Sequence, residues 1–269
     1  NLQLNSTSAQ TVGAITTSGI ETINVTQGAV AGGTQTLNLA ASTATTVNLT
    51  ATATNGNGKI IDLGTLNAAT TLVDGSGDVD TAGKFYATTT NTTAASLKGG
   101  SGANSLTGGA GNDTITIATG FDGSDTVSGG GAGASTDTLN ATFTAAQGAM
   151  DFTKVSAIEN YVLTIGTGLA VTVSDSGATG TTGLLDADTA SIKILGTTGS
   201  FTAIDEPIAT GAKFTGGTGT FDASGFAGTV EITANRTGFL LGDTFKGGSG
   251  TTDVLHVNAN TSTLTAVTV

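Results

Sequence analysis

Apolar and polar residues alternate along much of this chain with a period of two. Residues 22–26 and 46–50 both read Thr, apolar, Asn, apolar, Thr, which places the apolar side chains on one face and the polar ones on the other. Successive side chains of a strand point to opposite faces, so this alternation predicts short strands with one buried side. Similar segments recur with Gly, Ala or Ser turns between them, at residues 36–39, 59–63, 170–173, 191–195, 229–233 and 264–267. Only residues 144–150 suggest a helix, and a short one.

A glycine-rich segment interrupts the strand pattern. Residues 108–116 read Gly-Gly-Ala-Gly-Asn-Asp-Thr-Ile-Thr, and residues 99–107 carry the same nonapeptide with Asn104 at the acidic position. Residues 120–128 and 130–139 repeat it imperfectly. Glycine permits tight turns and lets carbonyl groups approach a cation, while Asp supplies the oxygen that a hard cation such as Ca²⁺ prefers. We expect calcium loops rather than a Gly/Ser linker, because apolar residues recur at the core-facing phase, namely Leu106, Ile115, Ile117, Val127 and Leu139.

The spacing of the nonapeptides predicts how their loops stack. One nonapeptide makes half a turn, so successive loops alternate between two edges, and an ion would lie between loops two repeats apart. The first and third repeats would share one edge, with Asn104 and Asp125, and the second and fourth the other, with Asp113 and Asp137. Asn104 offers a neutral amide oxygen where a carboxylate is expected, so its edge should bind more weakly.

A second glycine cluster lies near the end of the sequence. Gly242-Asp243-Thr244 resembles the back half of a nonapeptide, and residues 247–255 form a complete one with an insertion before Asp253. Asp243 and Asp253 are therefore candidate ligands. Asp222 and Asp78 are weaker ones, because Asp and Gly are common in solvated turns anyway.

The chain repeats itself at a larger scale. Residues 18–26 match 156–164, and residues 97–102 match 245–250, in the same order in both halves. Such repetition predicts a stacked architecture in which each unit buries its faces against its neighbours. We expect strand arrays over 1–96 and 141–241, a calcium roll over 97–140, and a second roll with the start of a further array over 242–269.

Composition and charge narrow the class of function. The 269 residues include 42 Gly, one Pro and no Cys, and the net charge is −12 with only 8 Lys and Arg. Nucleic acids and anionic membranes attract basic patches, so neither is an expected partner. No apolar run approaches the roughly 20 residues that span a bilayer. No signal peptide is visible, and we expect the sequence to be part of a longer protein.

Together, the glycine loops, the Thr-rich strand arrays and the recurring Ile-Glu-Thr or Ile-Glu-Asn strand resemble the C-terminal lattice-forming region of RTX-type bacterial surface-layer proteins. The resemblance implies an all-β fold: a right-handed parallel β-solenoid, or β-helix, with RTX calcium β-roll segments. It also implies secretion through a type I apparatus and folding when the chain meets calcium outside the cell. The folded chain would then assemble with copies of itself, and regions outside this sequence would attach it to cell-surface polysaccharide. The metal-binding residues it implies are Gly99, Gly100, Gly102, Asn104, Gly108, Gly109, Gly111, Asp113, Gly120, Asp122, Gly123, Asp125, Asp137, Asp243, Gly247, Gly250 and Asp253.

Three alternatives remain at this point. The same alternation of residues fits an antiparallel sandwich. The same solenoid would serve a secreted RTX adhesin or an extracellular filament. An enzyme such as a polysaccharide lyase would need acids, bases and cations clustered on one face. The Lys residues are scattered, Arg236 is the only Arg, and the Glu residues do not cluster, so we expect no catalytic site.

Overall fold

The computed structural model describes residues 1–4, 8–27, 33–51, 60–131, 135–174, 184, 190–204, 220–235, 244–250 and 252–258. They divide into two compact units, one of Asn1–Gly120 with Ser124–Thr138 and one of Phe121–Gly123 with Leu139–Val269. The described residues form β-strands and one 3-10 turn, Phe152–Lys154, which confirms the all-β class. No helix among them is long and apolar enough to cross a bilayer.

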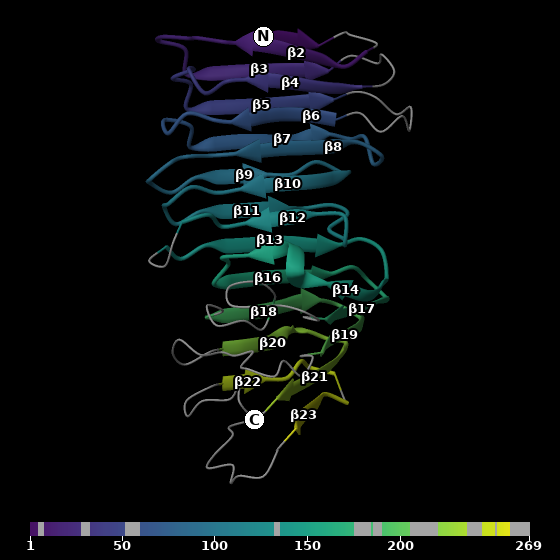
Figure 1. Cartoon of the computed structure of the whole chain (residues 1–269). Helices are drawn as coiled ribbons and strands as arrows, with labels where there is room; N and C mark the ends of the chain where they lie inside the picture. The colour runs from purple at the N-terminus through teal and green to yellow at the C-terminus, as the bar shows by residue number, and fades with distance from the viewer. Residues whose placement is uncertain are drawn as a thin grey trace. The chain divides into compact units, whose positions relative to one another are not determined.

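Unit 1 is a parallel β-solenoid of two sheets. The first sheet contains, in order, β1 (Leu2–Leu4), β3 (Thr22–Gln27), β5 (Thr46–Ala51), β7 (Leu72–Asp78), β9 (Ser96–Lys98) and β11 (Thr114–Ile117). The second contains β2 (Gln10–Ala14), β4 (Thr34–Asn38), β6 (Ile60–Thr65), β8 (Lys84–Thr88), β10 (Ala103–Thr107) and β12 (Thr126–Ser128). Each coil gives one strand to each sheet, and neighbouring strands pair in parallel (Figure 1). Parallel pairing excludes the antiparallel sandwich.

Unit 2 repeats this arrangement. One sheet contains β13 (Thr138–Phe143), β16 (Asn160–Ile165), β18 (Ser191–Gly196), β20 (Thr220–Phe226) and β22 (Thr244–Lys246). The other contains β14 (Gln147–Asp151), β17 (Leu169–Ser174), β19 (Gly199–Ile204), β21 (Thr229–Asn235) and β23 (Val254–Asn258), again in parallel pairs. The short strand β15 (Val155–Ser156) follows the 3-10 turn. The strands predicted over 36–39, 59–63, 170–173, 191–195 and 229–233 are confirmed, and the one over 264–267 lies outside the described residues.

The helix predicted over residues 144–150 is wrong. Residues Gln147–Asp151 form strand β14, which pairs in parallel with β17 and buries Met150. Ala, Gln and Met are good helix formers, but helix propensity is small per residue, and strand pairing with an adjacent coil overrides it here.

The apolar face of the alternation forms the core. The core-facing residues predicted from the nonapeptides are fully buried, as are the inward residues of the strand arrays, for example Val25, Val47 and Leu49. Burying a Val or Leu side chain contributes about 1.5–3 kcal/mol. The core of unit 2 also contains an aromatic cluster, in which Phe121 contacts Phe143 and Phe152 edge to face.

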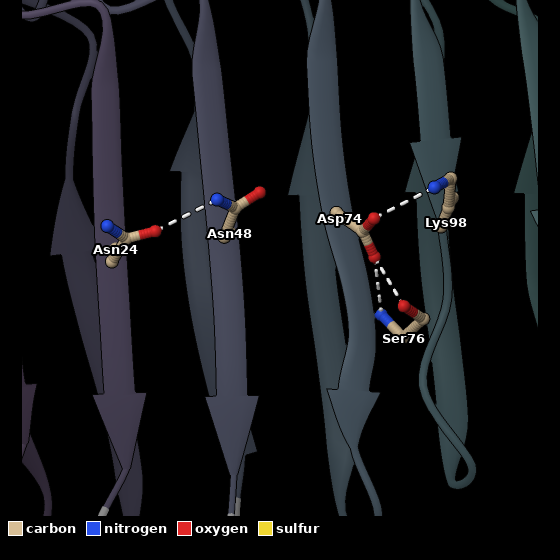
Figure 2. Close-up of polar contacts among 5 residues, drawn as sticks. All are labelled: Asn24, Asn48, Asp74, Ser76 and Lys98. Atoms are coloured by element: carbon tan, nitrogen blue, oxygen red, sulfur yellow. Dashed lines mark hydrogen bonds and ion pairs between the residues drawn. The ribbon is translucent and has the colours of Figure 1, made fainter.

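Polar side chains on the outer face form ladders from coil to coil. Figure 2 shows the Asn48 amide donating to the Asn24 side chain at 2.9 Å, and the Lys98 ammonium pairing with Asp74 at 2.8 Å. These four residues occupy aligned positions on β3, β5, β7 and β9. Outward polar side chains of neighbouring coils therefore bond to one another here.

Candidate metal centre

The glycine-rich nonapeptides of unit 1 form loops between strands. The loop at Gly99–Gly102 joins β9 to β10, and the loop at Gly108–Asp113 joins β10 to β11. Their glycines are required where backbones of adjacent coils touch. A Cβ on Gly109 would overlap the Asn91 carbonyl oxygen, and one on Gly111 would overlap that of Thr93. The loops therefore stack with carbonyl oxygens close to the neighbouring backbone.

On one edge, the second and fourth repeats meet through their acidic residues. The Asp113 backbone N–H donates to Asp137 Oδ1 at 2.6 Å. The Asp113 carboxylate accepts from the N–H groups of Ala95 and Gly109, each at 2.7 Å. The prediction that Asp113 and Asp137 share an edge is confirmed.

On the other edge, the first and third repeats meet at Asn104 and Asp125, as predicted. Asn104 donates to Asp125 Oδ1 from its backbone N–H at 2.8 Å and from its side-chain nitrogen at 2.9 Å. The same nitrogen donates to the carbonyls of Gly102 at 2.7 Å and Gly100 at 3.3 Å, while Oδ1 accepts from the Gly100 N–H at 2.8 Å. The amide nitrogen thus lies among three oxygen atoms of the kind that a cation would bind.

Burial makes the acidic side chains costly to ionise without a counter-charge. Asp113 is 1% exposed and Asp137 0%. Burial raises the pKa of the Asp113 carboxyl, and the hydrogen bonds from Ala95 and Gly109 offset this only in part. Burial likewise raises the pKa of Asp137, where the nearby Asp113 charge adds to the effect. A divalent cation would supply the missing positive charge.

These residues fit calcium. Among the described residues, no three His, Cys, Asp or Glu side chains converge as a metal cluster. An ion here would thus combine two carboxylates with backbone carbonyls, which is an all-oxygen donor set of the kind that Ca²⁺ takes. Asp113 and Asp137 would hold it on one edge. Asp125 is the carboxylate that the third repeat brings to Asn104 on the other edge.

The remaining predicted ligands lie in different surroundings. Gly120 has a positive φ of 73° and belongs to unit 1, whereas Asp122 and Gly123 belong to unit 2, where the Gly123 carbonyl accepts from Lys154. Their role as ligands stays a prediction.

In the second glycine cluster, Asp253 is exposed and accepts from the Val230 N–H at 3.0 Å. Its Oδ2 lies 2.6 Å from the position of a Cβ on Gly247, and a Cβ on Gly250 would overlap the Gly228 carbonyl. Asp243 lies outside the described residues. Asp222, a weaker candidate, instead bonds to Ser224 and Lys246 on the outer face.

Two buried acids fall outside the nonapeptide pattern. The pattern does not mark Asp80 at all and indicates Asp78 only weakly, yet both are 3% exposed. The available signal is the carboxylate-rich segment 74–80, which comes before the first glycine loop.

The chain was compared with protein families, curated proteins and solved structures. Residues 90–116, which contain Asn104 and Asp113, match the family model of the RTX calcium-binding nonapeptide repeat (4 copies). No curated protein and no solved structure matches the chain. The stacked acidic loops and this match agree: the chain carries RTX calcium-binding nonapeptide repeats on a parallel β-solenoid, and their ion is Ca²⁺.

Proposed function

We propose that this chain is a structural component of a bacterial cell-surface layer, secreted and then folded by calcium. The observation that supports the proposal most is the Asp113–Asp137 edge, where two carboxylates are buried on adjacent coils and both carboxyl groups have raised pKa values. Such an arrangement is unfavourable without a cation and favourable with one. Folding of the roll would then depend on the calcium concentration around the chain.

Calcium binding can supply enough free energy to decide whether the roll folds. Extracellular calcium modules bind with dissociation constants of about 10⁻⁴ to 10⁻³ M. A site at a hundredfold excess of calcium over its dissociation constant contributes about 2.7 kcal/mol to folding. Two or three sites would therefore match the lower part of the usual folding stability of about 5–15 kcal/mol. A calcium-poor cell interior would keep the loops open until export.

The proposed partners are other copies of this chain, arranged in a two-dimensional lattice. The solenoid exposes regular rows of Thr, Asn and charged side chains, such as the ladder from Asn24 to Lys98, and such rows offer repeated polar contacts to a neighbour. Attachment to cell-surface polysaccharide would fall to regions outside this sequence. The proposal includes no catalytic step and, with a net charge of −12, no nucleic-acid partner.

Circular dichroism with calcium and with excess chelator tests the folding step. We expect a strand spectrum in calcium, and in chelator a weaker strand signal with a lower melting temperature; Asp113→Asn should need more calcium to reach the full signal. An unchanged spectrum in chelator would refute calcium-dependent folding. Electron microscopy of calcium-assembled protein then separates the proposed sheet from the fibres that an adhesin or filament subunit would form.

A further inference from the structure

A pair of buried carboxylates lies outside the nonapeptides, in the turn between β7 and β8. Asp78 and Asp80 are each 3% exposed. Asp78 Oδ1 accepts from the Asp80 N–H at 3.0 Å, and Asp80 Oδ1 accepts from the Ala82 N–H at 3.1 Å. Within the described part of the chain, the buried Oδ2 of Asp80 has no hydrogen-bond partner. A buried carboxylate oxygen without a donor is costly, which calls for a ligand.

The first nonapeptide loop covers this turn. The Ser101 N–H donates to the Asp78 carbonyl at 2.9 Å. A Cβ on Gly100 would lie 2.7 Å from the Asp78 Cβ, and one on Gly102 would lie 2.5 Å from the Asp80 carbonyl oxygen and overlap that of Gly83. The glycines thus bring the loop close to the Asp78 side chain and to the backbone carbonyl oxygens of Asp80 and Gly83.

Unit 2 shows that the fold does not need acids at this turn. There the Ser249 N–H donates to the Phe226 carbonyl at 2.9 Å, as Ser101 does to Asp78 in unit 1. Phe226 is fully buried, and Gly228 follows it two positions later, as Asp80 follows Asp78. A Cβ on Gly250 would overlap the Gly228 carbonyl, as one on Gly102 meets that of Asp80. In unit 2 the apolar side chain of Phe226 is buried at this turn, whereas two carboxylates are buried there in unit 1.

We propose that Asp78 and Asp80, with the carbonyls of Asp80 and Gly83, form a calcium site beneath the first nonapeptide loop. The donors are all oxygen, with no imidazole or thiolate, which favours a hard cation over zinc or copper. Backbone carbonyls in an irregular turn suit Ca²⁺ better than Mg²⁺, since Mg²⁺ demands near-octahedral geometry and keeps its waters. The site extends metal binding from the glycine repeats into the preceding strand array, and it does not depend on the surface-layer proposal.

The test is the calcium content of the full chain, measured by equilibrium dialysis at about 10 mM calcium, which lies above the dissociation constants of about 10⁻⁴ to 10⁻³ M of extracellular calcium modules. Asp80→Asn should lose one calcium ion per chain relative to the parent protein. Asp62→Asn is the matched control, because the Asp62 side chain likewise accepts from the backbone N–H two residues later, that of Gly64 at 2.8 Å, but lies within β6 and is partly exposed. This control should keep the full count.

A second variant distinguishes loss of the calcium site from loss of the fold. Asp78→Phe with Asp80→Gly copies the turn of unit 2, and it should remain folded and also lack one ion. A full calcium count in either folded variant would overturn the site, as would failure of both variants to fold in excess calcium, because the turn would then need its acids for packing alone. Asp113→Asn reports separately on the nonapeptide site, so the two sites can fail independently.

Discussion

Substitution of Asn104 by Asp tests what stabilises the Asn104–Asp125 edge of the roll, which we expect to bind calcium more weakly than the other edge. In the structure, the Asn104 side-chain nitrogen donates to Asp125, Gly102 and Gly100, and its oxygen accepts from the Gly100 N–H. An Asp side chain keeps the acceptor, loses all three of the hydrogen bonds that the nitrogen donates, and places a second negative charge against Asp125. The amide therefore holds this edge together without metal, and the variant should make the edge depend on calcium.

The size of the effect follows from these contacts. Loss of a hydrogen bond to a charged group costs about 1.5–3 kcal/mol, and two like charges about 4 Å apart repel by about 4 kcal/mol at an effective dielectric constant of 20. In chelator, Asn104→Asp should therefore destabilise the roll by about 6 kcal/mol. At a hundredfold excess over the dissociation constant, calcium should restore about 2.7 kcal/mol.

Denaturant unfolding of the parent and the variant, in chelator and in calcium, measures both quantities, and dialysis counts the additional ion. Asn91→Asp is the matched control, since Asn91 is equally buried but its side chain bonds to Thr70 and Thr93 rather than to a carboxylate. The control should be destabilised alike in both conditions. If Asn104→Asp is as stable as the parent in chelator, or gains neither stability nor an ion in calcium, the reasoning is wrong.

Two further predictions concern the loops and their acids. Gly109→Ala should lower the unfolding free energy by about 1–3 kcal/mol or abolish folding of the roll, because its Cβ would overlap the Asn91 carbonyl. Gly123→Ala has open space at its Cβ and should be close to neutral. Denaturant unfolding of both variants measures the difference. The pKa of Asp137 is raised above 3.8, so in chelator its ionised form destabilises the fold at neutral pH, and this cost disappears as the pH falls through the folded pKa towards 3.8. With calcium bound, a fall in pH instead destabilises the fold, because protons displace the ion from the carboxylates. Melting temperatures measured from neutral pH down towards 3.8 should show opposite trends in the two conditions, and Asp137→Asn should reduce the difference; parallel trends would contradict the assignment.

Much of the fold could be predicted from local pattern. Alternation fixes which side of a strand is buried, so the sequence alone places Leu106 and Ile115 in the core, and both are fully buried. The pairing of Asn104 with Asp125, and of Asp113 with Asp137, also follows from sequence, because a nonapeptide of constant length makes a constant fraction of a coil.

The rest depends on contacts between coils. The donor role of the Asn104 amide requires that Gly102 and Asp125 lie on either side of it, which its own residue type does not specify. The burial of Asp80 is set by a loop about twenty positions later in the chain, and no repeat pattern marks it. The helix predicted where strand β14 lies is wrong for the same reason, since pairing with β17 outweighs local propensity.

The parallel pairing of each coil with the next has a consequence for the order of folding. The contacts that join coils connect residues only a short distance apart in sequence, 21 for Asn104 with Asp125, 24 for Asn24 with Asn48 and 31 for Asn160 with Ser191. Each newly delivered segment finds its partner in the segment just before it, so a chain leaving a narrow exit can add coils one at a time. Growth of this kind stops at the first segment that fails to dock, and the position of a defect, as well as its energetic cost, then decides how much of the unit forms.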